Sequence, residues 1–140
     1  MNIEQRVTKL VSVGWEIDAA RFDTIPQRFE ILVHEIAHNL LLGNMTPKDM
    51  AETDNLISDC SVEKSDADEI MASAITIQVL ETLYDVKTET NDSLFSVNGN
   101  VKQRKYFQTA VASDEVIELV GTPRVISYAK RIYDYIESVQ

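Results

Sequence analysis

Residues 29–43 have the sequence FEILVHEIAHNLLLG, in which nine of fifteen residues are apolar. Placed on a helical wheel, these apolar residues cover nearly every direction, which is typical of a helix buried on all sides. Thr24 ahead of Pro26 is a start signal for such a helix, and Gly43 with Asn44 is a stop signal. We therefore expect a central helix over residues 24–43, enclosed by the rest of the chain.

Helical periodicity extends over most of the remaining chain. From Ile3 to Trp15, apolar residues recur every three or four positions, and this spacing predicts a helix over residues 2–20. Further helices are expected over residues 46–58, 65–85 and 102–120, and from Thr122 to Ile136. The pair Asn98-Gly99 favours a short β-hairpin at residues 94–101. The sequence thus predicts a mainly α fold, with residues 1–140 as a single domain of five to six helices around the central one.

Length and composition narrow the class of protein. With 140 residues and a mass of 15.8 kDa, the chain suits one hydrophobic core. Its longest apolar runs are only three residues, so we expect no transmembrane helix and no signal peptide. Cys60 is the only cysteine and has no partner for an internal disulfide, which fits a reducing compartment. We therefore expect a cytoplasmic protein.

The net charge of −10 is concentrated in the middle of the chain. Residues 44–100 contain three Lys or Arg against twelve Asp or Glu. Such a balance disfavours nonspecific binding to nucleic acid or to an anionic membrane. It leaves three interpretations of residues 44–100: a solvated acidic surface, a cation site, or a docking face for a basic protein partner.

The two histidines of the chain, His34 and His38, stand four residues apart in the central helix, and Glu35 follows the first. Side chains at this spacing project from one side of a helix, so both imidazoles can reach one metal ion. Glu35 lies about 100° around the helix from His34, near enough to hold a metal-bound water as general base. The competing interpretation is a pair of hydrogen-bonded core histidines, which would bury two imidazoles and a carboxylate without a compensating cation.

This pattern resembles the active-site helix of the zincin metallopeptidases. The resemblance covers ten to fifteen residues: uncharged residues flank the motif at 31–33, fill it at 36–37 and continue at 39–40. Leu41 and Asn44 stand where the metzincin branch has Gly and His, so the similarity is to the gluzincin branch. That branch takes a third ligand from a Glu on a later helix, followed three residues on by a small residue. The resemblance implies Glu69, followed by Ala72, in this role.

The residues themselves leave the third ligand open. No further histidine exists, so a third protein ligand is a carboxylate or Cys60. Glu63, Asp66 and Asp68 are the alternatives to Glu69, and either aspartate could instead orient a ligand imidazole. Glu69 could also simply face the positive end of the helix dipole.

Two functional hypotheses follow. The first is a zinc-dependent hydrolase, most simply a small metallopeptidase acting on a peptide or protein substrate. Here Zn²⁺ is the cofactor, His34, His38 and Glu69 are its ligands, and Glu35 is the general base. The alternative is a non-catalytic acidic helical module that binds a basic protein partner through residues 44–100, with a structural metal or an incidental histidine pair.

Overall fold

A computed structural model describes residues 2–17, 24–41, 64–86 and 116–140, without the side chains of residues 64–69. Its elements are α1 (Ile3–Ser12), α2 (Ile25–Ile36), the π-helical turn η1 (Ala37–Leu41), α4 (Lys64–Gln78), the π-helical turn η3 (Val79–Leu83) and α7 (Pro123–Ser138). No strand occurs within these ranges, and the mainly α prediction is confirmed. The hairpin expected at 94–101, the helix at 46–58 and most of the helix at 102–120 lie outside the described residues. In the described part, no helix is long and apolar enough to cross a membrane.

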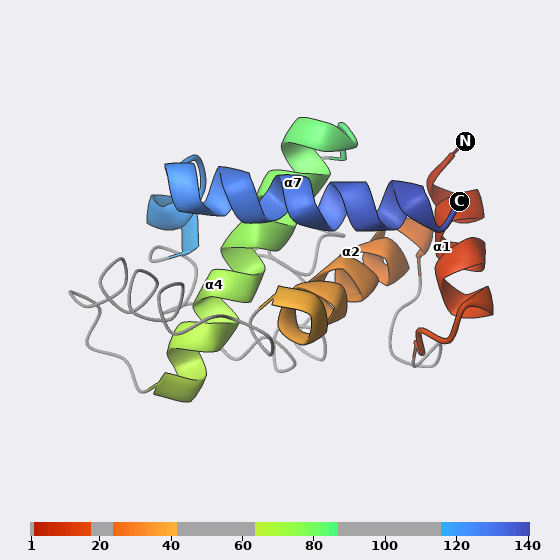
Figure 1. Cartoon of the computed structure of the whole chain (residues 1–140), viewed down its shortest axis with the longest axis horizontal. Coiled ribbons are helices and arrows are strands. Elements are labelled where there is room, and N and C mark those ends of the chain that lie inside the picture. Colours follow the sequence, from red (N-terminus) through yellow and green to blue (C-terminus); the bar gives the residue numbers. More distant parts are fainter. Residues whose placement is uncertain (1, 18–23, 42–63, 87–115) are drawn as a thin grey trace.

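Helix α2 packs between α1 and α4, as Figure 1 shows. One end of α2 is covered by α1, while α4 packs against both α2 and η1. The long helix α7 crosses α4 and contacts both π-helical turns. The chain ends therefore meet, since the N-terminus and the end of α7 lie at the same side of the molecule.

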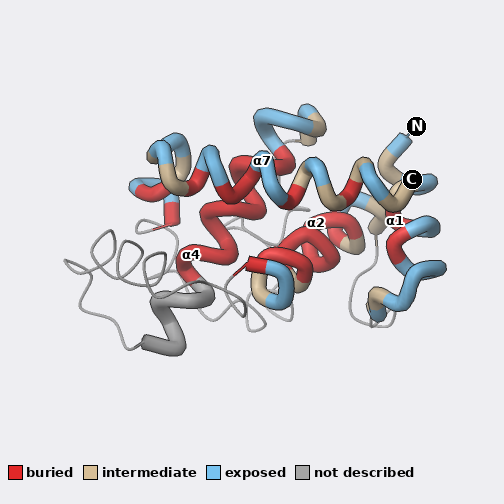
Figure 2. The backbone as a smooth tube through the Cα atoms, viewed as in Figure 1, coloured by how far each residue is buried: buried red, intermediate tan, exposed pale blue. Residues whose placement is uncertain are grey.

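The core lies where these helices face one another, and Figure 2 shows that burial follows α2 and α4 almost along their described lengths. The largest side chains with almost no exposed area are Phe29, Leu32, Ile36, Ile70, Met71, Ile75, Leu80, Tyr128, Ile132 and Ile136. The expected central position of the helix carrying the histidines is confirmed. A buried helix holds its side chains more rigidly than an exposed one, which suits a site that needs fixed geometry.

Two helices begin where the sequence places their start signals. The side-chain oxygen of Thr24 accepts a hydrogen bond from the backbone N–H of Gln27, and the Gln27 side chain accepts one from the backbone N–H of Thr24. This capping box satisfies backbone donors that a helix N-terminus leaves without partners. Thr122 occupies the corresponding position ahead of Pro123 in α7.

The first helix ends earlier than its periodicity predicts. Instead of reaching residue 20, α1 ends at Ser12. Gly14 adopts a φ of +114°, and the N–H groups of Gly14 and Trp15 donate to the carbonyls of Val11 and Leu10. This is a glycine-terminated helix end in which the left-handed residue turns the chain back. The prediction was wrong because Trp15 continues the apolar spacing while Gly14 already ends the helix.

Candidate metal centre

The two histidines face each other across one turn of the central helix. His34 lies in the last turn of α2 and is 1% exposed, whereas His38 lies in η1 and is partly exposed. Their Nε2 atoms are 3.1 Å apart, and the ring centroids are separated by 4.7 Å with the planes at 77°. The prediction that both imidazoles share one side of the helix is confirmed, and the same nitrogen of each ring points at the other.

This arrangement has a chemical consequence. A neutral imidazole carries a hydrogen on one nitrogen and a lone pair on the other. If both Nε2 atoms carried hydrogen, the two N–H groups would repel, so at most one of them is protonated. The two nitrogens can therefore share one hydrogen in a hydrogen bond, and they also lie close enough together to bind one metal ion.

The separation of the two nitrogens fits a shared zinc ion. Two histidine nitrogens bound to one tetrahedral zinc at about 2.0 to 2.1 Å lie roughly 3.3 to 3.4 Å apart. The observed 3.1 Å differs from this by only a few tenths of an ångström. His38 is the partly exposed ring of the two, and His34 is the buried one.

Two glutamates lie close to the pair along α2. Glu35 is partly exposed, as a group that exchanges protons with a bound molecule must be. Glu30 is 1% exposed and stands one turn before His34, so it shares that side of the helix. Glu30 was not predicted as a site residue. A charged residue within an apolar run, four positions ahead of a histidine, is the signal that could have found it.

The backbone of Glu69 lies in the first half of α4, the helix that packs against α2 and η1. Position 69 shares a helical face with Ala72, Ser73 and Thr76, which follow it by three, four and seven residues. All three are buried, with exposed fractions of 0%, 7% and 0%. The small residue at 72 therefore lies where close helix packing needs it, although the Glu69 side chain is outside the described part.

Among the side chains that the structure describes, no three of His, Cys, Asp or Glu come together as a metal-binding group. The histidine pair supplies two ligands, and the carboxylates proposed as the third, residues 63–69, fall outside the described side chains. Cys60 does so as well. A third ligand from this region is therefore compatible with the described geometry.

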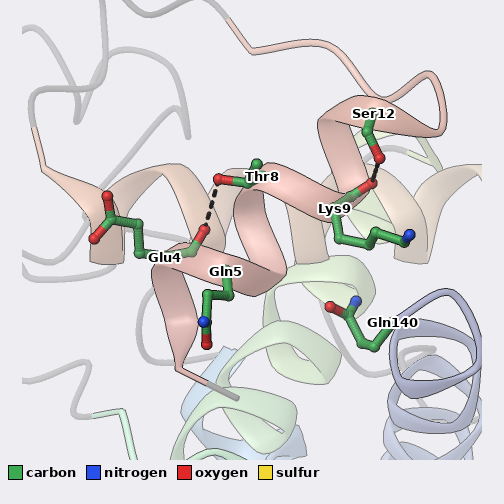
Figure 3. Close-up of a pocket in the computed structure, with 6 residues that line it drawn as sticks. All are labelled: Glu4, Gln5, Thr8, Lys9, Ser12 and Gln140. Carbon is green, nitrogen blue, oxygen red and sulfur yellow. Dashed lines mark hydrogen bonds between the residues drawn. The ribbon is translucent and has the colours of Figure 1, made fainter.

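A separate hollow of about 450 Å³ lies on the outer side of α1 (Figure 3). It is lined by one face of that helix together with a residue at the chain end: Glu4, Gln5, Thr8, Lys9, Ser12 and Gln140. The hydroxyls of Thr8 and Ser12 donate to the helix carbonyls of Glu4 and Lys9. No residue of α2 or α4 lines it, so this hollow is distinct from the histidine pair.

Comparison of the chain with protein-family models, curated proteins and solved structures found no match in any of the three. A function for this protein therefore has to be inferred from the geometry of the site and the chemistry of its side chains.

Proposed function

We propose that this protein is a small zinc-dependent hydrolase, most simply a metallopeptidase, with His34 and His38 as zinc ligands and Glu35 as the general base. The observation that carries the proposal is the approach of two identical imidazole nitrogens to 3.1 Å on the central helix of the fold. Burying the His34 imidazole in an apolar core is costly unless its nitrogens have polar partners, and a shared metal ion would be a strong one.

The exposure of the three side chains supports this division of roles. His34 is anchored in the core, while His38 and Glu35 are partly exposed and so accessible to a substrate. A bound zinc ion would polarise the scissile carbonyl and lower the pKa of a water molecule beside it. Glu35 would accept the proton of that water on its carboxylate and pass it to the leaving amine.

The third ligand belongs to the same proposal, with Glu69 as the candidate. The supporting observation is that Ala72, Ser73 and Thr76, which follow position 69 by three, four and seven residues, are buried, and that α4 packs directly against the helix of the histidines. With three protein ligands, zinc keeps one position open for water, as catalytic sites do.

Exchange of Glu35 for Gln tests the proposal. A glutamine can still hydrogen-bond a water molecule but cannot accept its proton, and the loss of a general base typically costs about 10² to 10⁴ in rate. We expect the Glu35→Gln variant to bind zinc and to melt at the same temperature as the wild type, but to lose hydrolytic activity. Cleavage of a denatured protein mixture, detected by mass spectrometry, measures that activity. Glu4→Gln, an exposed carboxylate on α1, is the matched control and should cleave like the wild type.

Two results would overturn the proposal. One is elemental analysis that finds no zinc in protein purified without a histidine tag, combined with melting unchanged by chelator. The other is equal cleavage by the wild type and Glu35→Gln, which would assign the activity to a contaminating protease.

A further inference from the structure

The backbone changes its hydrogen-bonding pattern between the two histidines. The α-helix ends at Ile36, and the π-helical turn η1 begins at Ala37. At the junction, the N–H of Ala37 points at the carbonyls of both Val33 and His34. A π-helical turn is wider than an α-helical one, so the direction of each side chain within it changes. Where His38 points, relative to His34, therefore depends on this turn.

One side chain bridges the junction. The Nδ2 amide of Asn39 donates a hydrogen bond of 2.8 Å to the backbone carbonyl of Glu35. In a regular α-helix, that carbonyl is the acceptor for the backbone N–H of residue 39. Here the side chain of Asn39 reaches back to it and joins the π-helical turn to the last turn of α2.

We infer that Asn39 is a positioning residue: its side-chain amide holds the η1 turn in the form that sets the His38 imidazole against that of His34. Asn39 is exposed and follows His38 directly, so the amide acts on the backbone at the site while taking no part in the core. Its effect on zinc binding rests on the proposed function. Its effect on the approach of the two rings does not.

Three variants separate the hydrogen bond from the size and charge of the side chain. Asn39→Ala removes the donor, and Asn39→Asp keeps the shape but, when ionised, offers only acceptors. Asn39→Thr restores a donor, because a hydroxyl can bond to the carbonyl four residues earlier. This molecule already contains two such bonds, from Thr8 to the carbonyl of Glu4 at 3.0 Å and from Thr76 to that of Ala72 at 2.7 Å.

Two measurements on the full chain test the inference. In metal-free protein, nuclear Overhauser effects between the ring protons of His34 and His38 should weaken in Asn39→Ala and Asn39→Asp and persist in Asn39→Thr. In competition with a chromophoric chelator, the zinc dissociation constant should rise about tenfold for the first two variants and stay within twofold for the third. The added charge of Asp would by itself attract zinc, so weaker binding there points to the lost donor.

Ring contacts that are unchanged in Asn39→Ala, with zinc affinity within twofold of the wild type, would overturn the inference. So would an Asn39→Thr variant as impaired as Asn39→Ala. If the wild type binds no zinc but Asn39→Ala still loses the ring contacts, the proposed function fails and the positioning role of Asn39 stands.

Discussion

Two polar clusters of this protein differ in the charges that they bring together. In the terminal cluster, Arg6 of α1, Tyr84 after η3 and Glu137 of α7 meet at the junction of the chain ends. Arg6 Nε and the Tyr84 hydroxyl each donate to Glu137 Oε1 at 2.8 Å, and the guanidinium lies 4.9 Å from the centre of the Tyr84 ring. In the histidine pair, by contrast, two identical groups face each other.

The terminal cluster has a structural role, whereas the histidine pair is the candidate for chemistry. The charges of Arg6 and Glu137 neutralise each other and connect helices 131 positions apart in the sequence, so the terminal cluster is complete within the chain. His34 and His38 come from neighbouring turns and stabilise no long-range contact with each other. In the proposed function, a metal ion from outside the chain would bind both imidazoles.

Removing one imidazole should have the largest effect on the contrast between the two clusters, because zinc binding is proposed for the histidine pair alone. We expect His34→Ala and His38→Ala each to weaken zinc binding by more than the roughly 10- to 100-fold typical of losing an orienting neighbour, because a direct ligand is lost. Isothermal titration calorimetry on metal-free protein gives the dissociation constants. Arg6→Met, which disrupts the terminal cluster instead, should leave zinc binding unchanged. Comparable zinc affinity in the histidine variants and in Arg6→Met would refute the assignment.

The next largest effect concerns the third ligand. If Glu69 binds the ion, Glu69→Ala should weaken zinc binding far more than Asp66→Ala or Asp68→Ala, since those aspartates at most orient a ligand. The same calorimetric titration, run on all three variants, decides between them. Equal losses in the three would move the third ligand to another residue.

Much of the fold could be predicted because its signals are local. Thr24 and Pro26 mark a helix start whose capping box involves only neighbouring residues, and Thr122 ahead of Pro123 marks the start of α7 without a side-chain capping bond. The apolar wheel of the central helix likewise needs no knowledge of its neighbours. The end of α1 was misplaced because the spacing of apolar residues and the left-handed turn at Gly14 compete, and spacing alone does not show which prevails.

The only part of the site that could be predicted is the part that follows from the geometry of a single helix. The shared side of His34 and His38 follows from their spacing and is confirmed. The η1 turn could not be anticipated, because the apolar spacing of residues 29–43 fits a continuous α-helix. The bond from Asn39 to the Glu35 carbonyl was not predicted either. Whether Glu69 and the histidines meet depends on how α4 packs on α2, which no local pattern specifies.

A smaller effect is expected from the terminal cluster itself. Glu137→Gln keeps the shape of the side chain but removes the charge that faces Arg6. The ion pair is partly exposed, with the two side chains 16% and 32% accessible, so its contribution should be about 0.5 to 1 kcal/mol. We expect the melting temperature to fall by about 2 to 4 °C in scanning calorimetry, with zinc affinity unchanged. A fall in zinc affinity would show that the two clusters are coupled.

The smallest expected effect is the pH dependence of the difference in melting temperature between the wild type and Glu137→Gln. The hydrogen bond from Arg6 lowers the pKa of Glu137 below its ordinary value of 4.5, against the opposing effect of burial. Since the folded state favours the ionised carboxylate, the stability from this group is present above the ordinary pKa and is lost as the pH falls through the folded one. The melting temperatures of the wild type and Glu137→Gln should therefore differ at pH 7 and converge as the pH falls through the lowered pKa of the folded state. A difference that persists unchanged into acid would mean that the variant acts through packing and not through charge.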